Sequence, residues 1–413
     1  MQVHEGQYVI GQQPVLALAE EFGTPLYVYD GGRIIRQIQQ LREAFPGISL
    51  KIKYAAKALT TLAVLQLMRR EGVELDVVSP QELELGLRAG YAGTQITFTP
   101  SGVSFDEIEQ AVAAGAMVNL DNLDVLERFG QRYGGSVPCF IRIKPNVAAG
   151  GNRKIMTAHE ASKFGIDIRQ RDRILALVGQ YGIRVVGLHQ HTGSDIKEAE
   201  ALLEAAGKLF ELAHEFPDLQ AIDLGGGFKV AYRDGDAVTD LPRFGRDLSG
   251  FFRAFCQQYG RDLELWFEPG KYLVSEAGTL LVRTNVVKEA PGRTFVGVNS
   301  GLNHLIRPMM YDAWHDIVNV SNPAASERAT YDVVGYICET DTFAEQRPLA
   351  PVRPGDVLAF KNAGAYGFTM SSQYNSRFRP AEVLVLDGQA RLIRRRETMD
   401  DLLRNQIPLG SAQ

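Results

Sequence analysis

Eight short runs rich in β-branched and aromatic residues alternate with helix-like segments between about residues 50 and 270. Such an alternation predicts a parallel sheet, because neighbouring parallel strands must be joined by a long crossover. Eight units over roughly 220 residues favour a closed (β/α)8 barrel of the TIM type, with a doubly wound open sheet as the alternative. The runs are LKIKYAA, ELDVVS, QITFTP, AMVNLD, PCFIRIKP, VVGLHQH, AIDLGGG and LELWFEPG.

The helix-like segments carry their own start and stop signals. In SPQELELGLRAG, Ser79 stands at the N-cap, Pro80 takes the first helical position, and Glu82 completes a capping box. The final glycine of this segment predicts the end of the helix. The segment SFDEIEQAVAAG repeats the pattern between residues 104 and 115. Both segments are therefore predicted to be helices between strands.

The pattern changes after about residue 280, where strand-like runs follow one another with turn signals and few helices. This pattern predicts a C-terminal β domain, either a sandwich or a barrel. The N-terminal stretch that ends in PLYVYD fits either domain, and we place it with the β domain. The expected domains are residues 30–275 for the barrel, and residues 1–29 together with 276–413 for the β domain.

Composition narrows the class of protein. A chain of 413 residues is too long for one ordinary core, which agrees with two domains. The net charge of −5 gives no sign of binding to nucleic acid or to a membrane surface. The sequence shows neither a signal-peptide pattern nor an apolar run as long as a membrane span. The three scattered cysteines argue against a disulfide framework or a zinc site, so we expect no metal and a reducing, cytoplasmic setting.

Polar side chains gather where the predicted barrel strands end. Lys57 follows the first strand, Asp76 lies in the second, and Arg142 lies near the end of the fifth. The sixth, seventh and eighth runs lead into HQHTGSD, DLGGGF and FEPGK. Because the active sites of (β/α)8 barrels lie at the C-terminal ends of the strands, we expect these side chains to form one site.

The segment DLGGGF runs from a strand directly into Gly225, Gly226 and Gly227. Such a triplet lets backbone N–H groups close around an anion, usually a phosphate, although a plain tight turn explains it equally well. The hydroxyl of Ser194 in HTGSD is placed to add a contact to the same phosphate. The sequence has no GxxxxGK(S/T) motif, so a nucleoside triphosphate is not indicated.

A phosphate site beside an amine at a strand end indicates pyridoxal phosphate as the cofactor. Lys57 would form the Schiff base, for which its amine must be partly desolvated. Glu268 would face the pyridine nitrogen and keep it protonated, so that the ring becomes a strong electron sink. His191 would lie flat on the ring, whereas His189 is expected to be a core residue. Taken singly, these positions also fit a surface lysine, an ion-paired glutamate and a core histidine.

Six strings along the chain resemble the fold-type III pyridoxal phosphate decarboxylases, in order and with the right gaps. They are YAAKA, HQHTGS, DLGGGF, EPGKYLVSEAG, ICETDTFA and GAYGFTMSSQYNSRFRPAEVLV, the last being the most specific. The resemblance implies a barrel followed by a β domain, an architecture shared with alanine racemase. It also implies a homodimer whose two active sites lie at the subunit interface and take a small amino-acid substrate.

The resemblance assigns roles to single residues. It implies that Lys57, His191, Glu268 and Cys338 are catalytic, with Cys338 and Glu339 supplied by the partner chain. The cofactor-binding positions are Lys57, Asp76, Arg142, His191, Ser194, Gly225, Gly226, Gly227, Glu268, Lys271 and Tyr366. The substrate-binding positions are Lys271, Arg307, Tyr311, Glu339 and Tyr366.

Two departures from the family pattern lie near the substrate. Lys271 in EPGK stands where the family usually has an arginine that holds phosphate or a substrate carboxylate, and lysine lacks the bidentate fork. The string CETDTFA replaces a commoner serine–glycine variant after the CE pair. Both differences bear on the identity of the substrate more than on the class of reaction.

The expected reaction is the loss of CO₂ from an amino acid whose far end carries a carboxylate. Arg307 favours such an end, because guanidinium matches a carboxylate in fork geometry. Diaminopimelate has this end and a distal amine that Glu339 would pair with, so the product would be L-lysine. Cys338 would return a proton to the α-carbon, unless it is a buried, inert cysteine.

Three other functions remain as alternatives. A racemase of this architecture tends to place arginine at the pyridine nitrogen, which Glu268 argues against. A non-catalytic pyridoxal phosphate carrier is a lone barrel, whereas this chain has a β domain carrying ICETD. A decarboxylase of the same family with another carboxylate-ended substrate stays open because of Lys271.

Overall fold

The computed structural model of the chain describes residues 1–147, 162–197, 199–233 and 235–409. The chain divides into two compact units. The first, here called the β unit, contains Met1–Ile34, Tyr232–Asp234 and Val274–Gln413. The second, here called the barrel unit, contains Ile35–Ala231 and Gly235–Leu273.

The barrel unit contains a closed ring of parallel strands, which confirms the predicted (β/α)8 fold. The ring runs in the order β5, β6, β7, β8, β9, β11, β12 and β13, and β13 pairs in parallel with β5 to close it. The bounds are β5 Ser49–Ala55, β6 Glu74–Val77, β7 Ile96–Phe98, β8 Met117–Leu120, β9 Cys139–Lys144, β11 Val185–His189, β12 Ala221–Asp223 and β13 Glu264–Phe267, with β10 (Ile166–Asp167) beside β9.

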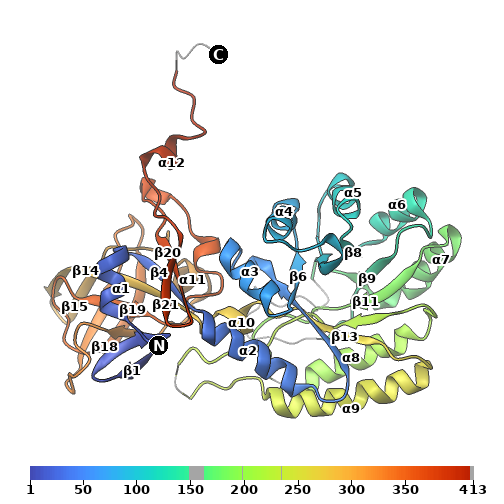
Figure 1. The fold of residues 1–413 in the computed structure, drawn as a ribbon, viewed down its shortest axis with the longest axis horizontal. Helices are drawn as coiled ribbons and strands as arrows, with labels where there is room; N and C mark the ends of the chain where they lie inside the picture. Colours follow the sequence, from blue (N-terminus) through green and yellow to red (C-terminus); the bar gives the residue numbers. More distant parts are fainter. Residues whose placement is uncertain (148–161, 198, 234, 410–413) are drawn as a thin grey trace. The chain divides into compact units, whose positions relative to one another are not determined.

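Helices connect these strands and lie outside the ring, as can be followed in Figure 1 from blue to yellow. The helices are α2 Gly31–Ala44, α3 Leu62–Arg70, α4 Pro80–Arg88, α5 Phe105–Ala113, α6 Leu123–Tyr133, α7 Arg171–Tyr181, α8 Ala199–Ala213, α9 Leu241–Tyr259 and the short α10 Lys271–Val274. Because the eight strands are parallel, their carboxyl ends all lie at one end of the ring.

The start of α4 differs in one detail from the predicted capping box. The Ser79 hydroxyl accepts from the N–H of Glu82 at 3.1 Å, as expected for an N-cap. The Glu82 carboxylate instead accepts from the N–H of Val78 at 2.9 Å, one residue before the N-cap. The helix still begins at Pro80 with Ser79 as its N-cap, and Glu82 ties the residue before the N-cap to the first turn.

Large side chains fill the middle of the ring. The rings of Phe140 on β9 and Trp266 on β13 stack with centroids 4.7 Å apart. Gly187 on β11 makes room for them, because a Cβ there would lie 2.2 Å from the Phe140 ring. Lys53 on β5 is almost fully buried, 4.1 Å over the Trp266 ring, and is paired with Glu74 at 2.7 Å. This layer forms the floor beneath the carboxyl ends of the strands.

The β unit is built on a mixed sheet, so the predicted second, β-rich part of the fold is also confirmed. Its strand order is β18, β17, β15, β14, β4, β20 and β21, with β19 paired to β14 and β16. β4, the PLYVYD stretch, lies between β14 and β20. The bounds are β4 Leu26–Asp30, β14 Gly278–Ala290, β15 Arg293–Val298, β16 Ile317–Asn319, β17 Ala329–Val334, β18 Thr342–Leu349, β19 Val357–Phe360, β20 Ala381–Leu386 and β21 Gln389–Arg394.

Smaller elements complete the β unit. A three-stranded antiparallel sheet forms at the N-terminus, and three short helices belong to the same unit. They are β1 Gln2–His4, β2 Gln7–Ile10, β3 Gln13–Pro14, α1 Val15–Phe22, α11 Arg307–Tyr311 and α12 Met399–Leu403. Among the described residues, no helix is both long and apolar enough to cross a membrane.

YDVVGYIC is one of the strand-like runs predicted after residue 280, and the prediction is wrong at its end, since β17 stops at Val334. The chain then turns back on itself, with the N–H of Gly335 donating to the backbone oxygen of Asp341 at 2.7 Å. The Asp341 carboxylate accepts from the N–H of Ile337 at 3.0 Å and from that of Leu302 at 2.8 Å. Cys338 therefore lies in a short loop closed by Asp341, not in a strand.

Candidate active site

The next layer of interior side chains lies above the floor layer. Because alternate residues of a strand face the same side, this next layer is formed by the residues two positions after Phe140, Gly187 and Trp266. These positions hold Arg142, His189 and Glu268, all buried. The interior cluster at the carboxyl ends of the strands comprises Lys57, Asp76, Arg142, His189, Asp223 and Glu268.

Lys57 lies in a 3-10 turn, Ala56–Ala58, directly after β5. Its Nζ lies 3.6 Å from the carboxylate of Asp76, whose side chain is fully buried, while the Lys57 side chain is 41% exposed. Burial, and secondly the charge of Glu268, raise the pKa of Asp76 to about 8, although Lys57 lowers it. Asp76 therefore holds a proton near neutral pH and is within reach of exchanging it with the Lys57 amine.

Replacing Asp76 by asparagine is expected to stabilise the chain freed of cofactor, by an amount that depends on pH. A carboxyl group whose pKa is higher in the folded than in the unfolded state binds more protons when folded, so stability falls as pH rises between the two values. Asp76→Asn removes this loss, so the gain should grow from about pH 4 to pH 8 and then level off. We expect about 2–6 °C in the unfolding midpoint at pH 8.

The measurement is thermal unfolding at several pH values, with Asp172→Asn as the matched control. Asp172 is a highly exposed aspartate, so the control should not shift the midpoint. A gain for Asp76→Asn that is the same at pH 4 and pH 8 would contradict the raised pKa of Asp76.

Glu268, which follows β13, is held by His189 at the end of β11. His189 Nε2 lies 3.1 Å from Glu268 Oε2, and both side chains are buried. Burial lowers the pKa of His189, so the neutral ring donates its N–H to the carboxylate. Burial opposes the ionisation of Glu268, but the contact with His189 and the charge of Lys57 bring its pKa below the usual range. Glu268 is thus the ionised carboxylate of the cluster.

Asp223 completes a group of three buried side chains with His189 and Glu268. Burial, and secondly the charge of Glu268, raise the pKa of Asp223 well above its ordinary value. One nitrogen or carboxylate oxygen from each of the three side chains lies within 4.8 Å of the others. His189 is buried as predicted, but its bond to Glu268 makes it part of the site and not only of the core.

The glycine loop after β12 is packed against two other strand ends. A Cβ on Gly226 would lie 2.4 Å from the backbone oxygen of Glu268, and one on Gly227 would lie 2.5 Å from that of Gly193. The N–H of Gly225 donates to Asp223 at 2.8 Å. The loop therefore needs glycine for close approach of backbone to backbone, beside the cluster.

His191 is tied to the same loop. The N–H of Gly226 donates to its Nδ1 at 3.1 Å. Burial, and secondly the positive charges of Arg142 and Lys57, lower the pKa of His191 to about 3. His191 is thus a neutral ring of fixed orientation next to the glycine loop.

Lys271, the departure from the family pattern, is already paired within the barrel unit. Its Nζ lies 2.8 Å from Oδ2 of Asp195, and only 8% of its side chain is exposed. Asp195 follows Ser194 directly, and the N–H of Ile196 donates to the backbone oxygen of Gly227 at 3.0 Å. Lys271, Ser194 and the glycine loop therefore belong to one neighbourhood.

In the β unit, α11 begins at Arg307 and ends at Tyr311, so the four-residue spacing is helical as the sequence suggested. The Arg307 guanidinium is 6% exposed and donates to the hydroxyl of Tyr232 at 3.1 Å. Its Nε is buried with no hydrogen-bond partner in the described part of the chain. Arg307 is thus a fixed, buried cation with donor capacity to spare.

The loop of the predicted ICETD residues presents its polar groups outward. Cys338 and Glu339 are both exposed. The hydroxyl of Tyr374 donates to Glu339 at 2.5 Å, and the amide of Asn375 donates to Cys338 Sγ at 3.2 Å. On this chain Cys338 is therefore not a buried cysteine, and its part in proton transfer stays a prediction. Tyr366 lies beyond β19 with a φ of +56°, and its phosphate contact stays a prediction.

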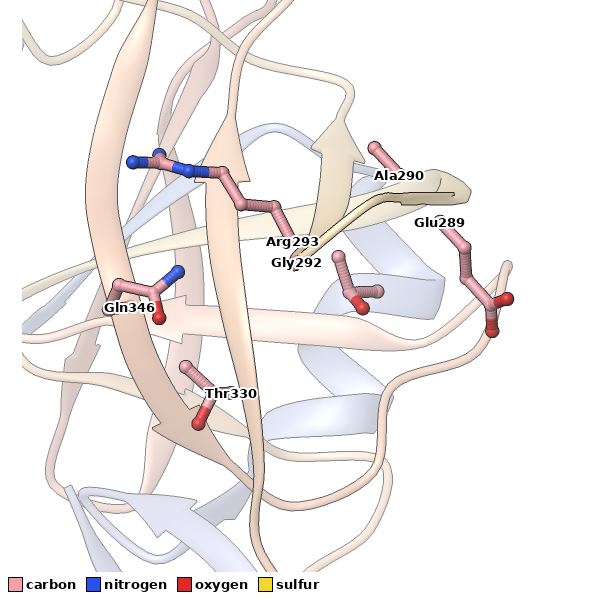
Figure 2. A pocket seen from close by; sticks show the side chains of 7 residues that line it. Glu289, Ala290, Gly292, Arg293, Thr330 and Gln346 are labelled. Atoms are coloured by element: carbon pink, nitrogen blue, oxygen red, sulfur yellow. The ribbon is translucent and has the colours of Figure 1, made fainter.

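A hollow of about 290 Å³ lies at the turn between β14 and β15. Figure 2 shows Arg293, Thr330 and Gln346 around it. None of the residues predicted from the sequence lines this hollow. Arg293 is already paired with Asp332 at 2.8 Å, which leaves the carboxylate of Glu289 as the other charged group of the lining.

Comparison with known proteins agrees with this geometry. Residues 31–275 match the pyridoxal binding domain of the pyridoxal-dependent decarboxylases. The diaminopimelate decarboxylase of Methanothermobacter thermautotrophicus is 38% identical over 97% of this chain and 96% of its own. That of Bacillus subtilis is 34% identical over 98% and 97%. The structure of the Helicobacter pylori enzyme with L-lysine is similar with a TM-score of 0.86 and 32% identity, over 94% of this chain and 98% of that chain.

The barrel places a lysine at one strand end and an ionised, buried glutamate at another. Together with matches over this length, these features define a pyridoxal-dependent decarboxylase, and the chain belongs to that family. Within it, the chain groups with the diaminopimelate decarboxylases, which it resembles along nearly its whole length.

Proposed function

We propose that the chain decarboxylates meso-2,6-diaminopimelate to L-lysine and CO₂ with pyridoxal phosphate, the last step of lysine biosynthesis. The observation that carries this function is the coincidence of a full-length likeness to diaminopimelate decarboxylases with the arrangement of Lys57 and Glu268 in the barrel. A barrel that merely shared the fold would not need this pair of groups.

The residues of the barrel unit fit the cofactor. Oε1 of Glu268 is buried and has no hydrogen-bond partner among the described residues, so it can accept from a protonated ring nitrogen. The glycine loop lies beside this cluster and would be the place for the cofactor phosphate, since glycines let backbone approach an anion closely. When bound, pyridoxal phosphate takes up the electron pair released as the bond between the α-carbon and its carboxylate breaks.

Lys57 would hold the cofactor covalently and give it up to the substrate amine. For that it must be an uncharged amine at the moment of bond formation. Asp76, at 3.6 Å, is the group placed to exchange a proton with Nζ of Lys57. Glu268 would supply a negative charge to the protonated ring nitrogen, and neutral His191, which accepts from the N–H of Gly226, would pack against the ring.

Arg307 and Tyr311 would hold the far carboxylate of the substrate, and Glu339 its distal amine. Support comes from the buried guanidinium of Arg307 with an unpartnered Nε. Arg307 has no carboxylate within ion-pair distance in the part of the chain that is described, so an incoming carboxylate would be its natural partner. Lys271 would hold either the cofactor phosphate or a substrate carboxylate.

Cys338 would return a proton from its thiol to the α-carbon, and would do so in the partner's active site. Support comes from the outward position of Cys338 and Glu339 on their loop. An exposed thiol at a subunit interface is accessible to a substrate bound by another chain. We therefore propose a homodimer, and a cytoplasmic location in keeping with three unpaired cysteines.

Mixing two inactive variants tests the shared site. Chains carrying Lys57→Ala and chains carrying Cys338→Ala should each be inactive, but a heterodimer would contain one site with both native residues. Random mixing makes half of the dimers heterodimeric, so about a quarter of the native activity should return. Mixing each variant with itself is the control. A mixture that stays inactive would mean that each chain builds its own site.

The substrate is tested by incubating the enzyme with diaminopimelate, lysine, ornithine and glutamate in turn and measuring CO₂. Release from diaminopimelate alone is expected. Release from another carboxylate-ended amino acid would instead support a decarboxylase of different specificity, which the Lys271 position favours.

A further inference from the structure

The ion pair of Lys271 and Asp195 is more enclosed than a surface pair. The two side chains are 8% and 21% exposed, and Nζ lies 2.8 Å from Oδ2. The other carboxylate oxygen of Asp195, Oδ1, is buried with no hydrogen-bond partner among the described residues. Asp195 also has a φ of +60°, which few residues other than glycine adopt. The backbone of Asp195 is therefore in the left-handed region, and from there its carboxylate makes the ion pair with Lys271.

The pair stands beside the glycine loop. Asp195 lies between Gly193, whose oxygen would be 2.5 Å from a Cβ on Gly227, and Ile196, whose N–H donates to the oxygen of Gly227. Lys271 comes three residues after Glu268, whose own backbone oxygen abuts Gly226. Both members of the pair therefore reach the loop from the two segments that pack against it.

The charges of the pair matter because a phosphate ester carries about −1.5 to −2 at neutral pH. A lysine alone beside the glycine loop would attract this charge, but a paired aspartate cancels it. We propose that Asp195 is a positioning residue that holds the Lys271 ammonium beside the glycine loop and, through its own charge, limits the affinity of the site for the cofactor phosphate. This inference rests on the proposed phosphate site at the glycine loop.

The test compares how tightly the full chain, freed of cofactor, binds pyridoxal phosphate and pyridoxal, which lacks the phosphate. The ratio of the two dissociation constants isolates the phosphate contribution, since both compounds react with Lys57. Asp195→Asn keeps an acceptor for Lys271 but removes the charge, so the preference for the phosphorylated form should rise about fivefold to tenfold.

Variants of Lys271 test the other half of the pair. Lys271→Gln leaves the Asp195 charge uncompensated beside the phosphate, so the preference should fall at least about tenfold. The double variant Lys271→Gln/Asp195→Asn should recover part of this loss, and Lys271→Arg should stay near the native value. Asp247→Asn on α9 removes an exposed carboxylate and should change nothing.

The outcomes separate this inference from the proposed function. If the native chain binds pyridoxal as tightly as pyridoxal phosphate, the phosphate site itself is wrong. If the native chain prefers the phosphate but Asp195→Asn leaves that preference unchanged or lowers it, only the role of Asp195 is overturned. An effect of Asp195→Asn on the KM for diaminopimelate alone would assign Lys271 to the substrate carboxylate and also overturn the inference.

Discussion

The variant Lys57→Ala is expected to lose the absorbance of bound cofactor at the violet edge of the visible spectrum, together with at least about 1000-fold in kcat. The reason is geometric. Lys57 lies directly after β5, and its Nζ is 3.6 Å from the carboxyl group of Asp76, which holds a proton. The Lys57 side chain is 41% exposed, so incoming molecules can reach its amine. No other lysine side chain of the interior cluster shares this position, because Lys53 is paired with Glu74 on the floor layer below.

Lys51→Ala is the matched control. Lys51 lies on β5 itself, six residues before Lys57, and is paired with Glu74 and Glu264. Its loss removes a lysine and an ion pair but should leave the absorbance and kcat near native values. The role of Lys57 would be wrong if Lys57→Ala kept the visible absorbance, or if the control lost it equally.

The barrel could be predicted because its signal is local and repeated. Each strand run and each helix start is encoded within about ten residues, and the closure of eight units follows from their number. The placement of Lys57, Asp76 and Glu268 at one end of the ring follows from topology alone, since all strands of a parallel barrel point the same way. Asp223 could have been found by the same rule, because it ends β12 in DLGGGF and faces the interior two residues after Ala221.

Other parts of the site depend on contacts between segments distant in sequence. The partner of Lys271 is Asp195, 76 positions away, and nothing in EPGK indicates it. Tyr232 contacts Arg307 across 75 positions. The end of β17 at Val334 is set by the Asp341 carboxylate capping backbone N–H groups of the following loop, whereas the residues of YDVVGYIC alone favour a longer strand. Such features need the folded chain, because they are determined by neighbours and not by propensity.

Replacing Arg307 is expected to lower kcat/KM for diaminopimelate by about 2–5 kcal/mol, or roughly 30- to 5000-fold, if Arg307 holds the far carboxylate. The guanidinium is 6% exposed and fixed by Tyr232, so its charge is poorly screened and its fork is already oriented. Arg307→Ala would remove the buried guanidinium that is expected to pair with the substrate carboxylate. Arg307→Lys keeps the charge but not the fork and should fall between the native and alanine values.

Two further measurements make the Arg307 result specific. Bound-cofactor absorbance should be unchanged in both variants, which shows that the barrel unit and Lys57 are intact. Tyr232→Phe removes the hydroxyl that accepts from Arg307 but not the cation, so a smaller loss of about 1 kcal/mol is expected. If Arg307→Ala instead turns over diaminopimelate like the native chain, the guanidinium is structural and the argument for a carboxylate-ended substrate fails, because no other buried cation with an unpartnered donor lies on α11.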